Sequence, residues 1–207
     1  MVGDQAGFTA ATYMRGCRWV CNPTTLLSMV DASLGGKTGF ELPQGKNLVG
    51  AFHPPGMVLA DPEVLTCLPE REMRAGMAEV IKHGVVGDPH LYALCSQGWS
   101  EVNKNIVYIV RRGMTVKVWV IEDDPLEKGR WAALNFGHTI GHAVEFASGY
   151  ELLHGEAVSI GMVAEARYAV KSGQAEVGLA DLLAETLTGM GLPIDIPENL
   201  DRSVILK

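Results

Sequence analysis

The sequence predicts an α/β segment followed by an all-α segment, and two observations place the change at Pro69. Two short apolar runs, Arg18 to Asn22 and Met57 to Ala60, end just before prolines and are typical of strands. From Pro69 onwards, apolar residues recur at helical spacing, which is the pattern of helices that bury one face. We therefore expect two domains, residues 1–68 and residues 69–207.

Composition indicates a globular protein with a sizeable core. The 207 residues are 47% hydrophobic and carry a net charge of −7, with a pI near 5.3. The negative charge disfavours a nucleic-acid partner, because phosphate neutralisation needs a basic face. No apolar run reaches the ~18–20 residues of a membrane span, and no signal pattern opens the chain. The four cysteines, among them Cys17 and Cys21, lack the paired spacing of metal-binding motifs and fit a reducing compartment. We therefore expect buried free thiols and a location in the cytoplasm.

The first domain is expected to combine strands with short helical stretches. The chain opens on Val2-Gly3-Asp4, which has the character of a turn without its preceding strand, so we expect the chain to start inside a larger motif. Phe8 to Gly16 has helical spacing, and Thr24-Thr25 can cap a helical turn from Leu26 to Val30. Leu65 to Pro69 is expected to close the strand-rich part.

Residues 33–50 are rich in glycine and lysine and predict a flexible loop. Gly36-Lys37-Thr38 resembles the end of a phosphate-binding P-loop, but that motif needs a glycine at position 31, where the chain has aspartate. What remains is a flexible backbone with Lys37, Lys46 and the amide of Asn47, which suits an anionic small molecule. A solvated glycine-rich turn is the alternative interpretation.

The helical domain carries two lysines whose positions allow more than one interpretation. Glu79 and Lys82 lie three residues apart on its first helix, a spacing that usually gives a surface ion pair. Lys117 stands among apolar residues of the helix expected over Asn103–Ile121, so it either reaches solvent along its stem or has a function. Further helices are expected over His154–Lys171 and Leu179–Leu187.

Three of the six histidines fall between Leu134 and Glu156 and suggest a metal site. His138 and His142 lie one turn apart on a helix, and His154 follows in a glycine-flanked turn that can fold back onto them. Neutral imidazoles that converge from fixed elements suit a divalent metal. Ordinary core or surface histidines are the alternative, and helix spacing by itself pairs His138 with His142.

Eight short motifs follow one another along the chain. They are Ala11–Gly16, Pro23–Leu27, Val30–Ser33, Gly35–Thr38, Gly45–Leu48, Ala78–Lys82, Asn135–His138 and His154–Val158. In this order they resemble 3-dehydroquinate synthase, from Val2 to about residue 170. The resemblance implies the second half of a Rossmann-like NAD domain, followed by an incomplete, mostly helical domain that binds metal and substrate.

The resemblance implies an enzyme of the shikimate pathway, a carbon–oxygen lyase that works as a homodimer. It would use NAD and a divalent metal, zinc in the first place and cobalt as the alternative. Its substrate would be 3-deoxy-D-arabino-heptulosonate 7-phosphate, a phosphorylated sugar acid, which it converts to 3-dehydroquinate with loss of phosphate. NAD would take a hydride and return it later, so that the cofactor is regenerated.

The resemblance also assigns residues to three groups. The metal ligands would be Glu79, His138 and His154, a set that differs from the helix-face pairing. The NAD site would contain Asp4, Thr24, Thr25, Lys37, Lys46, Leu68 and Glu72. The substrate would meet Asp31, Asn47, Lys82, Lys117, Asn135 and His142, together with Arg15, which reaches the phosphate held by the neighbouring subunit.

The chain departs from the family's pattern in two ways. The family begins earlier and continues past Lys207, so we expect a truncated chain that binds NAD weakly and turns over poorly. Trp131 stands where the family has an arginine, which is expected to meet the carboxylate of the substrate. Three alternatives stay open: another sugar-phosphate cyclase, a metal-dependent alcohol dehydrogenase of the same fold, and a non-catalytic remnant. A dehydrogenase of this kind does not need to bind a substrate phosphate. Its expectation is therefore disfavoured by the cationic residues Lys37, Lys46, Lys82, Lys117 and Arg15.

Overall fold

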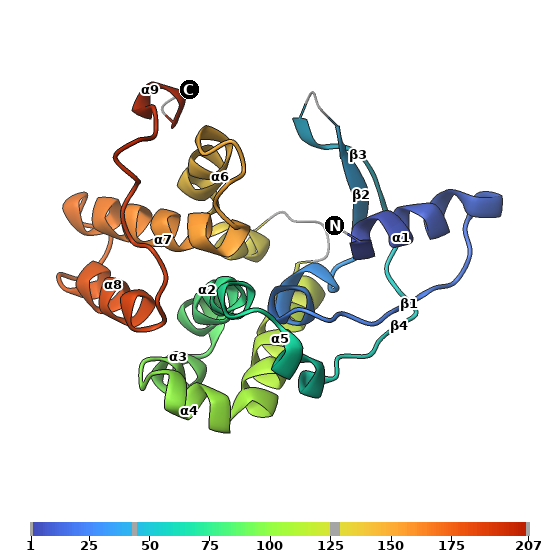
Figure 1. Cartoon of the computed structure of the whole chain (residues 1–207), viewed down its shortest axis with the longest axis horizontal. Helices are drawn as coiled ribbons and strands as arrows, with labels where there is room; N and C mark the ends of the chain where they lie inside the picture. The colour runs from blue at the N-terminus through green and yellow to red at the C-terminus, as the bar shows by residue number, and fades with distance from the viewer. Residues whose placement is uncertain (1, 43–44, 125–128, 206–207) are drawn as a thin grey trace.

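The computed structural model describes residues 2–42, 45–124 and 129–205, without the side chains of residues 45–47 and 130. Strands and short helices occupy one end of the molecule, and packed helices occupy the other (Figure 1). In this part of the chain every strand lies before residue 59, and every helix of 18 residues begins at or after Glu70. The predicted order, α/β first and helical second, is confirmed, whereas the domain boundary at Pro69 stays a prediction.

The α/β part consists of two small sheets and the helices beside them. Its elements are α1 (Val2–Thr12), η1 (Tyr13–Arg15), β1 (Val20–Cys21), η2 (Ser28–Ala32), β2 (Lys37–Leu42), β3 (Gly45–Phe52), β4 (Met57–Val58) and η3 (Pro62–Cys67). β1 and β4 pair in parallel, with Val20 opposite Met57, whereas β2 and β3 form an antiparallel hairpin. α1 packs on this hairpin, and the rings of Phe8 and Phe40 meet edge to face with centroids 5.4 Å apart.

The flexible loop expected over residues 33–50 is instead largely the β2–β3 hairpin. Gly39 and Gly50 lie opposite each other in it. A Cβ on Gly39 would come within 2.5 Å of the carbonyl oxygen of Val49, so a larger residue would force the strands apart. The glycines therefore serve close strand pairing, which a count of glycines along the sequence does not distinguish from a loop.

Other local expectations for the α/β part also need correction. Val2-Gly3-Asp4 forms the first turn of α1, where an acidic residue is favoured by the helix dipole. Leu65, expected to close the strand-rich part, lies in the 3-10 helix η3, after the last strand of the described ranges. The expectation of buried free thiols holds for only two of the four cysteines: Cys21 and Cys95 are buried, whereas Cys17 and Cys67 are exposed.

The helical part follows η3. Its elements are α2 (Glu70–Gly87), α3 (Pro89–Cys95), α4 (Trp99–Lys104), α5 (Ile106–Asp123), η4 (Arg130–Asn135), α6 (His138–Ala147), α7 (His154–Lys171), α8 (Leu179–Gly189) and α9 (Arg202–Ile205). The bounds of α7 agree with the prediction, the helix expected over Asn103–Ile121 is divided at Asn105 into α4 and α5, and α9 was not predicted. None of the helices in the described ranges is long and apolar enough to cross a membrane.

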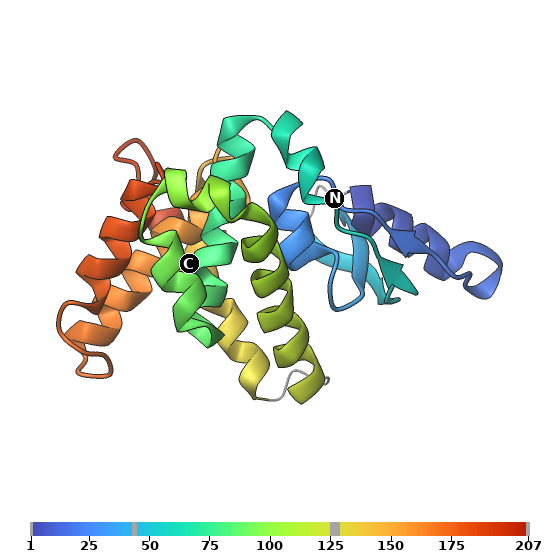
Figure 2. The ribbon, with the colours of Figure 1, turned by 90° about the horizontal axis from the view of Figure 1, so that it is seen from below.

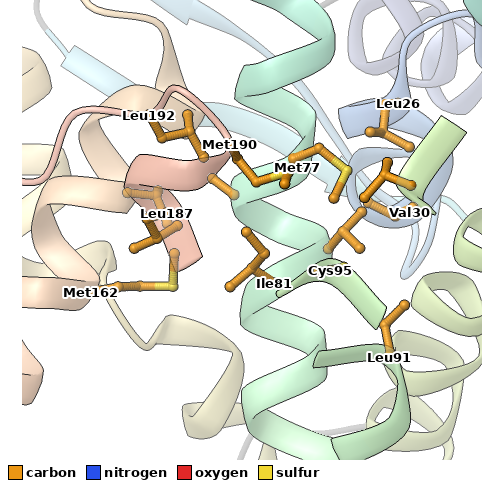
Figure 3. Packing of buried hydrophobic residues seen from close by; sticks show 14 of the residues in the cluster. Leu26, Val30, Met77, Ile81, Leu91, Cys95, Met162, Leu187, Met190 and Leu192 are labelled. Atoms are coloured by element: carbon orange, nitrogen blue, oxygen red, sulfur yellow. The ribbon is translucent and has the colours of Figure 1, made fainter. Parts of the chain in front are cut away.

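Helix α2 forms the centre of the main hydrophobic core. Figure 3 shows Met77 and Ile81 of this helix between Leu187 on one side and Leu26 on the other. Figure 2 shows α5 on the side of the helical part that faces the α/β part, and α5 contacts η2 there. Because α2 is covered by neighbours, every one of its residues 75–84 is buried.

Candidate metal centre and nucleotide hollow

A carboxylate and two imidazoles converge where α2, α6 and α7 meet. Glu79 comes from the middle of α2, while His138 and His154 are the first residues of α6 and α7. Oε1 of Glu79 lies 3.6 Å from Nε2 of His138 and 3.5 Å from Nε2 of His154. One ligand atom from each residue falls within 4.8 Å of the others, so the three side chains can hold one metal ion.

Glu79 has the spare acceptor capacity that a metal would use. Its side chain is fully buried, and neither carboxylate oxygen has a hydrogen-bond partner among the described residues, although Lys82 forms an ion pair with it. A buried carboxylate without hydrogen bonds is costly. A cation between this carboxylate and the two imidazoles would remove that cost, so the donor set fits a divalent metal.

Glycines bring the three helices close enough for these side chains to meet. Gly155 of α7 lies against α2, and a Cβ there would overlap the carbonyl oxygen of Ala75. Gly161, further along α7, lies against the start of α6, and a Cβ there would overlap the carbonyl oxygen of Gly137. A larger residue at either position would push α7 away from α2 or α6 and separate the ligands.

Burial and nearby charges give the two imidazoles different protonation states. Burial and then the ammonium of Lys82 lower the pKa of His138 to about 4. Burial opposes the charge of His154, but Glu145 and Glu79 raise the pKa of that imidazole to about 9. Burial also opposes the charge of Glu79, yet Lys82 and then His154 hold its pKa well below the ordinary value. Without metal, His138 is therefore neutral, and His154 carries a proton that a metal must displace.

The expectation that Glu79 and Lys82 form a surface pair is wrong. Their exposed fractions are 0% and 1%, because neighbours cover α2 at this level. The side chain of Lys117 is only 11% exposed, and its Nζ lies 2.6 Å from Oδ1 of Asp31 instead of extending into solvent. Burial opposes the charge of Asp31, but this ammonium and that of Lys82 leave the pKa of Asp31 below its ordinary value. Two carboxylates and two ammonium groups therefore adjoin one another next to the ligand imidazoles.

Two residues of this region, His83 and Glu145, were not among the predicted site residues. His83 lies one turn after Glu79 on α2 and is fully buried, with Nε2 3.8 Å from Oδ1 of Asp31. Oε2 of Glu145 lies 3.7 Å from Nδ1 of His154, where it can orient this ligand. Helical spacing from Glu79 points to His83 in the sequence. Nothing comparable points to Glu145, because it comes from α6 and His154 from α7.

His142 and Asn135, both predicted to face substrate, are exposed beside the metal centre. The ring centroid of His142 lies 5.2 Å from that of His138 and 5.7 Å from that of His154. Asn135 ends η4, three residues before His138. The helix-face pairing of His138 with His142 is not the set that converges on Glu79; His142 instead forms a second possible ligand group with Glu145 and His154.

A hollow of about 370 Å³ lies between α1, β1 and η2. Four residues predicted for the NAD site line it: Asp4, Thr24, Thr25 and Lys37. Two other predicted residues, Leu68 and Glu72, do not line it, because Leu68 packs against the helical core and Glu72 is exposed on the first turn of α2. The side chains of Lys46 and Asn47 lie outside the part that the structure describes.

Arg15 and Trp131 occupy very different surroundings. Arg15 is exposed in η1, in a backbone conformation with φ +69, and belongs to none of the groups above. Trp131 is buried and packs with Val120 and Leu134. Its ring centroid lies 4.8 Å from Nζ of Lys37, so it contacts a residue predicted for the nucleotide site.

Solved structures of two synthases share this fold. ValA, a 2-epi-5-epi-valiolone synthase from Streptomyces hygroscopicus subsp. jinggangensis 5008 with NAD+ and Zn2+ bound, is 28% identical, with a TM-score of 0.88 over 97% of this chain and 57% of that one. A 2-deoxy-scyllo-inosose synthase complexed with carbaglucose-6-phosphate, NAD+ and Co2+ is 30% identical, with a TM-score of 0.86 over 99% and 57%. The fold is that of the sugar-phosphate cyclases, which confirms a partial Rossmann-like part followed by a helical domain.

Family models cover the whole chain. The model of the N-terminal part of 3-dehydroquinate synthase matches residues 1–75, and that of the C-terminal part matches residues 76–207. The chain therefore belongs to the 3-dehydroquinate synthase family. Curated relatives called 3-dehydroquinate synthase, from Symbiobacterium thermophilum and Geobacter metallireducens, are each 50% identical over 97% and 95% of this chain. The chain spans 58% and 56% of the lengths of these two relatives.

Proposed function

We propose that the protein catalyses the 3-dehydroquinate synthase reaction, in which 3-deoxy-D-arabino-heptulosonate 7-phosphate loses phosphate and closes to 3-dehydroquinate. The observation that carries the proposal is the convergence of Glu79, His138 and His154, with the ammonium of Lys82 paired to the carboxylate. Family membership supports the same reaction. This reaction would make the protein a carbon–oxygen lyase of the shikimate pathway.

Glu79, His138 and His154 would hold a divalent metal, zinc in the first place and cobalt as the alternative. One carboxylate and two imidazoles leave positions open for the hydroxyl groups of a substrate. When bound, the metal supplies Lewis-acid polarisation of a substrate hydroxyl, and NAD supplies a hydride acceptor. Glu145 faces Nδ1 of His154 and so favours the tautomer whose Nε2 lone pair points toward Glu79.

The charged residues next to the imidazoles would bind the substrate. Lys82 and Lys117 offer positive charge that stabilises negative charge developing on substrate oxygens and on the leaving phosphate. His142 stands beside the ligand imidazoles, where it can accept or donate a proton. The remaining substrate residues would be Asp31, Asn47 and Asn135. Arg15 would serve the phosphate site of the neighbouring subunit in a homodimer, a role that its exposed position in η1 supports.

The hollow beside α1 would take part of the NAD molecule. Asp4 can accept hydrogen bonds from ribose hydroxyls, and the hydroxyls of Thr24 and Thr25 can bind polar groups of the cofactor. The ammonium of Lys37, and that of Lys46 beyond it in the hairpin, would pair with the pyrophosphate. Leu68, in the connection between η3 and α2, and Glu72, on the first turn of α2, would act from outside the hollow. The cytoplasmic location stays a prediction.

A sugar phosphate without a carboxylate is the second candidate substrate, and Trp131 is the observation that favours it. An indole offers a single neutral donor, so it cannot make the bidentate pairing that a guanidinium makes with a carboxylate. Sedoheptulose 7-phosphate is such a compound. The match of the other motifs favours the heptulosonate substrate, and family membership argues against an alcohol dehydrogenase.

Product formation tests the proposal. The sample should include everything that the natural open reading frame encodes around these 207 residues. This protein should release one phosphate for each 3-dehydroquinate formed when NAD and zinc are present. Removal of the metal by a chelator should stop turnover. Glu79→Gln should abolish turnover while the circular dichroism spectrum stays that of the wild type. Absence of product from metal-loaded, NAD-bound protein would refute the proposal and favour a non-catalytic remnant.

A further inference from the structure

The start of α6, where His138 stands, is held by an acidic side chain of α7. The carboxylate of Glu165 accepts two backbone N–H bonds, from Gly137 at 2.7 Å and from Ile140 at 3.3 Å. Gly137 is the N-cap residue of α6 and has no side chain that could bond these groups itself. Glu165 therefore caps a helix other than its own.

The two bonded N–H groups flank His138 along the chain, so Glu165 fixes the backbone on both sides of this ligand. Nδ1 of His138 lies 3.3 Å from the carbonyl oxygen of Phe136, in the tautomer that donates from Nδ1, and this leaves Nε2 directed at Glu79. The direction of the imidazole therefore depends on the peptide geometry of residues 136–140.

The close contact of α6 and α7 leaves this peptide segment little room to move. Gly137 has φ +80, and a Cβ on it would overlap the side chain of Met162 and lie 2.8 Å from the carbonyl oxygen of Val158. Gly161, one turn before Glu165 on α7, also lies against Gly137, because a Cβ on Gly161 would overlap the carbonyl oxygen of Gly137. Glu165 thus meets the start of α6 at a place that both helices already fix.

We propose that Glu165 is a positioning residue of the metal centre: through the backbone of residues 137–140, it holds His138 in the direction that meets Glu79 and His154. The inference rests on the proposed metal site and adds a residue that touches neither metal nor substrate. The carboxylate also places a negative charge at the N-terminus of α6, where the helix dipole favours it. Partners that orient a ligand in this way typically change metal affinity by 10- to 100-fold.

The Glu165→Gln variant tests the inference, because it keeps the shape of the side chain and removes its charge. We expect the zinc affinity of the 207-residue chain, measured by competition with a chelator, to fall by about 10- to 100-fold. The visible absorption of bound Co2+ should change as well, because this spectrum reports the geometry of the ligands. A purely structural cap would lower the melting temperature without changing either readout.

Asp88→Asn is the matched control. Asp88 caps α3 by accepting the N–H of Leu91 at 3.1 Å, and no candidate metal ligand stands at the start of that helix. This variant should lower the melting temperature and leave the zinc affinity and the Co2+ spectrum as in the wild type. Wild-type zinc affinity in Glu165→Gln, or an equal loss in both variants, would overturn the inference. A wild-type chain that binds no zinc would instead overturn the proposed function.

Hydrogen exchange in the wild type keeps the inference testable if Glu165→Gln does not fold. The amides of Gly137 and Ile140 should exchange more slowly than those of Gly178 and Asp181, the matching positions of α8. That helix also starts after a glycine in the left-handed conformation and has no side-chain cap. Equal exchange rates at the two helix starts would overturn the role of Glu165.

Discussion

The ammonium of Lys117 lies 2.6 Å from Oδ1 of Asp31 and joins α5 to η2. Lys117 is 11% exposed and Asp31 22% exposed, so water screens this pair only weakly. The pair connects the helical part of the molecule to the α/β part next to the candidate metal centre, because a carboxylate oxygen of Asp31 lies within 4.8 Å of one of Glu79. It therefore links the stability of the fold to the arrangement of the site.

Removing Lys117 should destabilise the protein more than removing an exposed lysine. Lys117→Met leaves the partly buried carboxylate of Asp31 without the ammonium closest to it, and we expect the free energy of unfolding, measured by urea titration, to fall by about 2–3 kcal/mol. Lys104→Met is the control, because Lys104 pairs with Glu101 at 2.6 Å but is 65% exposed. That change should cost less than about 1 kcal/mol. Equal losses in the two variants would show that burial of the Lys117 pair is unimportant.

The metal content of the purified protein should depend on the three converging side chains. Glu79→Gln removes the anionic ligand and His154→Ala removes an imidazole, so dialysed samples of both should contain much less zinc than the wild type. His90→Ala, which removes an exposed histidine of α3, should keep the full metal content. Atomic emission analysis gives the amounts. Undiminished zinc in both ligand variants would mean that the metal binds elsewhere.

Metal binding should release protons and strengthen as the pH rises. The pKa of His154 in the metal-free protein is raised to about 9, so this imidazole is protonated at pH 7.5, and a metal can bind only its neutral form. The zinc affinity should therefore rise about tenfold per pH unit between pH 7 and pH 8.5 and level off above pH 9. Calorimetry in buffers of different ionisation enthalpy counts the protons. Binding at pH 7.5 without proton release would contradict the raised pKa.

The same pKa shift fixes how His154 affects stability without metal. The pKa of His154 in the folded state lies above the ordinary value of 6.5. The contribution of His154 to the free energy of unfolding is therefore fully present below pH 6.5 and is lost as the pH rises through about 9. Chelated wild-type protein should therefore unfold at a lower urea concentration at pH 9.5 than at pH 6.5. His154→Ala should remove this part of the pH dependence, and an unchanged slope in that variant would assign it to other groups.

Trp131→Arg should improve turnover of a carboxylate-bearing substrate. When a buried substrate carboxylate lacks a guanidinium partner, transition-state binding weakens by about 2–5 kcal/mol, which lowers kcat/KM by roughly 30-fold or more. In the protein from its natural reading frame, we expect the variant to gain on 3-deoxy-D-arabino-heptulosonate 7-phosphate and not on sedoheptulose 7-phosphate. Because Trp131 is buried against Val120 and Leu134, thermal unfolding must be measured in parallel. A folded variant without this gain would show that position 131 does not face the carboxylate.

The sequence by itself determined the class of the fold, the family and the main helices. The apolar spacing from Pro69 onwards predicts α2, and the run that begins at His154 predicts both ends of α7. These predictions succeed because helix formation is governed by short-range spacing and by residues at the helix ends. The order of the eight motifs likewise identified the family, because order along the chain is a property of sequence alone.

Only the tertiary structure decided which charges are buried and whether the side chains that the family resemblance groups together converge. Spacing on one helix pairs His138 with His142, whereas the fold brings His138 and His154 to Glu79 from three different helices. The same spacing rule makes Glu79 and Lys82 a surface pair, but neighbours cover α2 and bury both. Burial and convergence depend on contacts between residues far apart in the chain, and periodicity within a segment carries no information about what covers it.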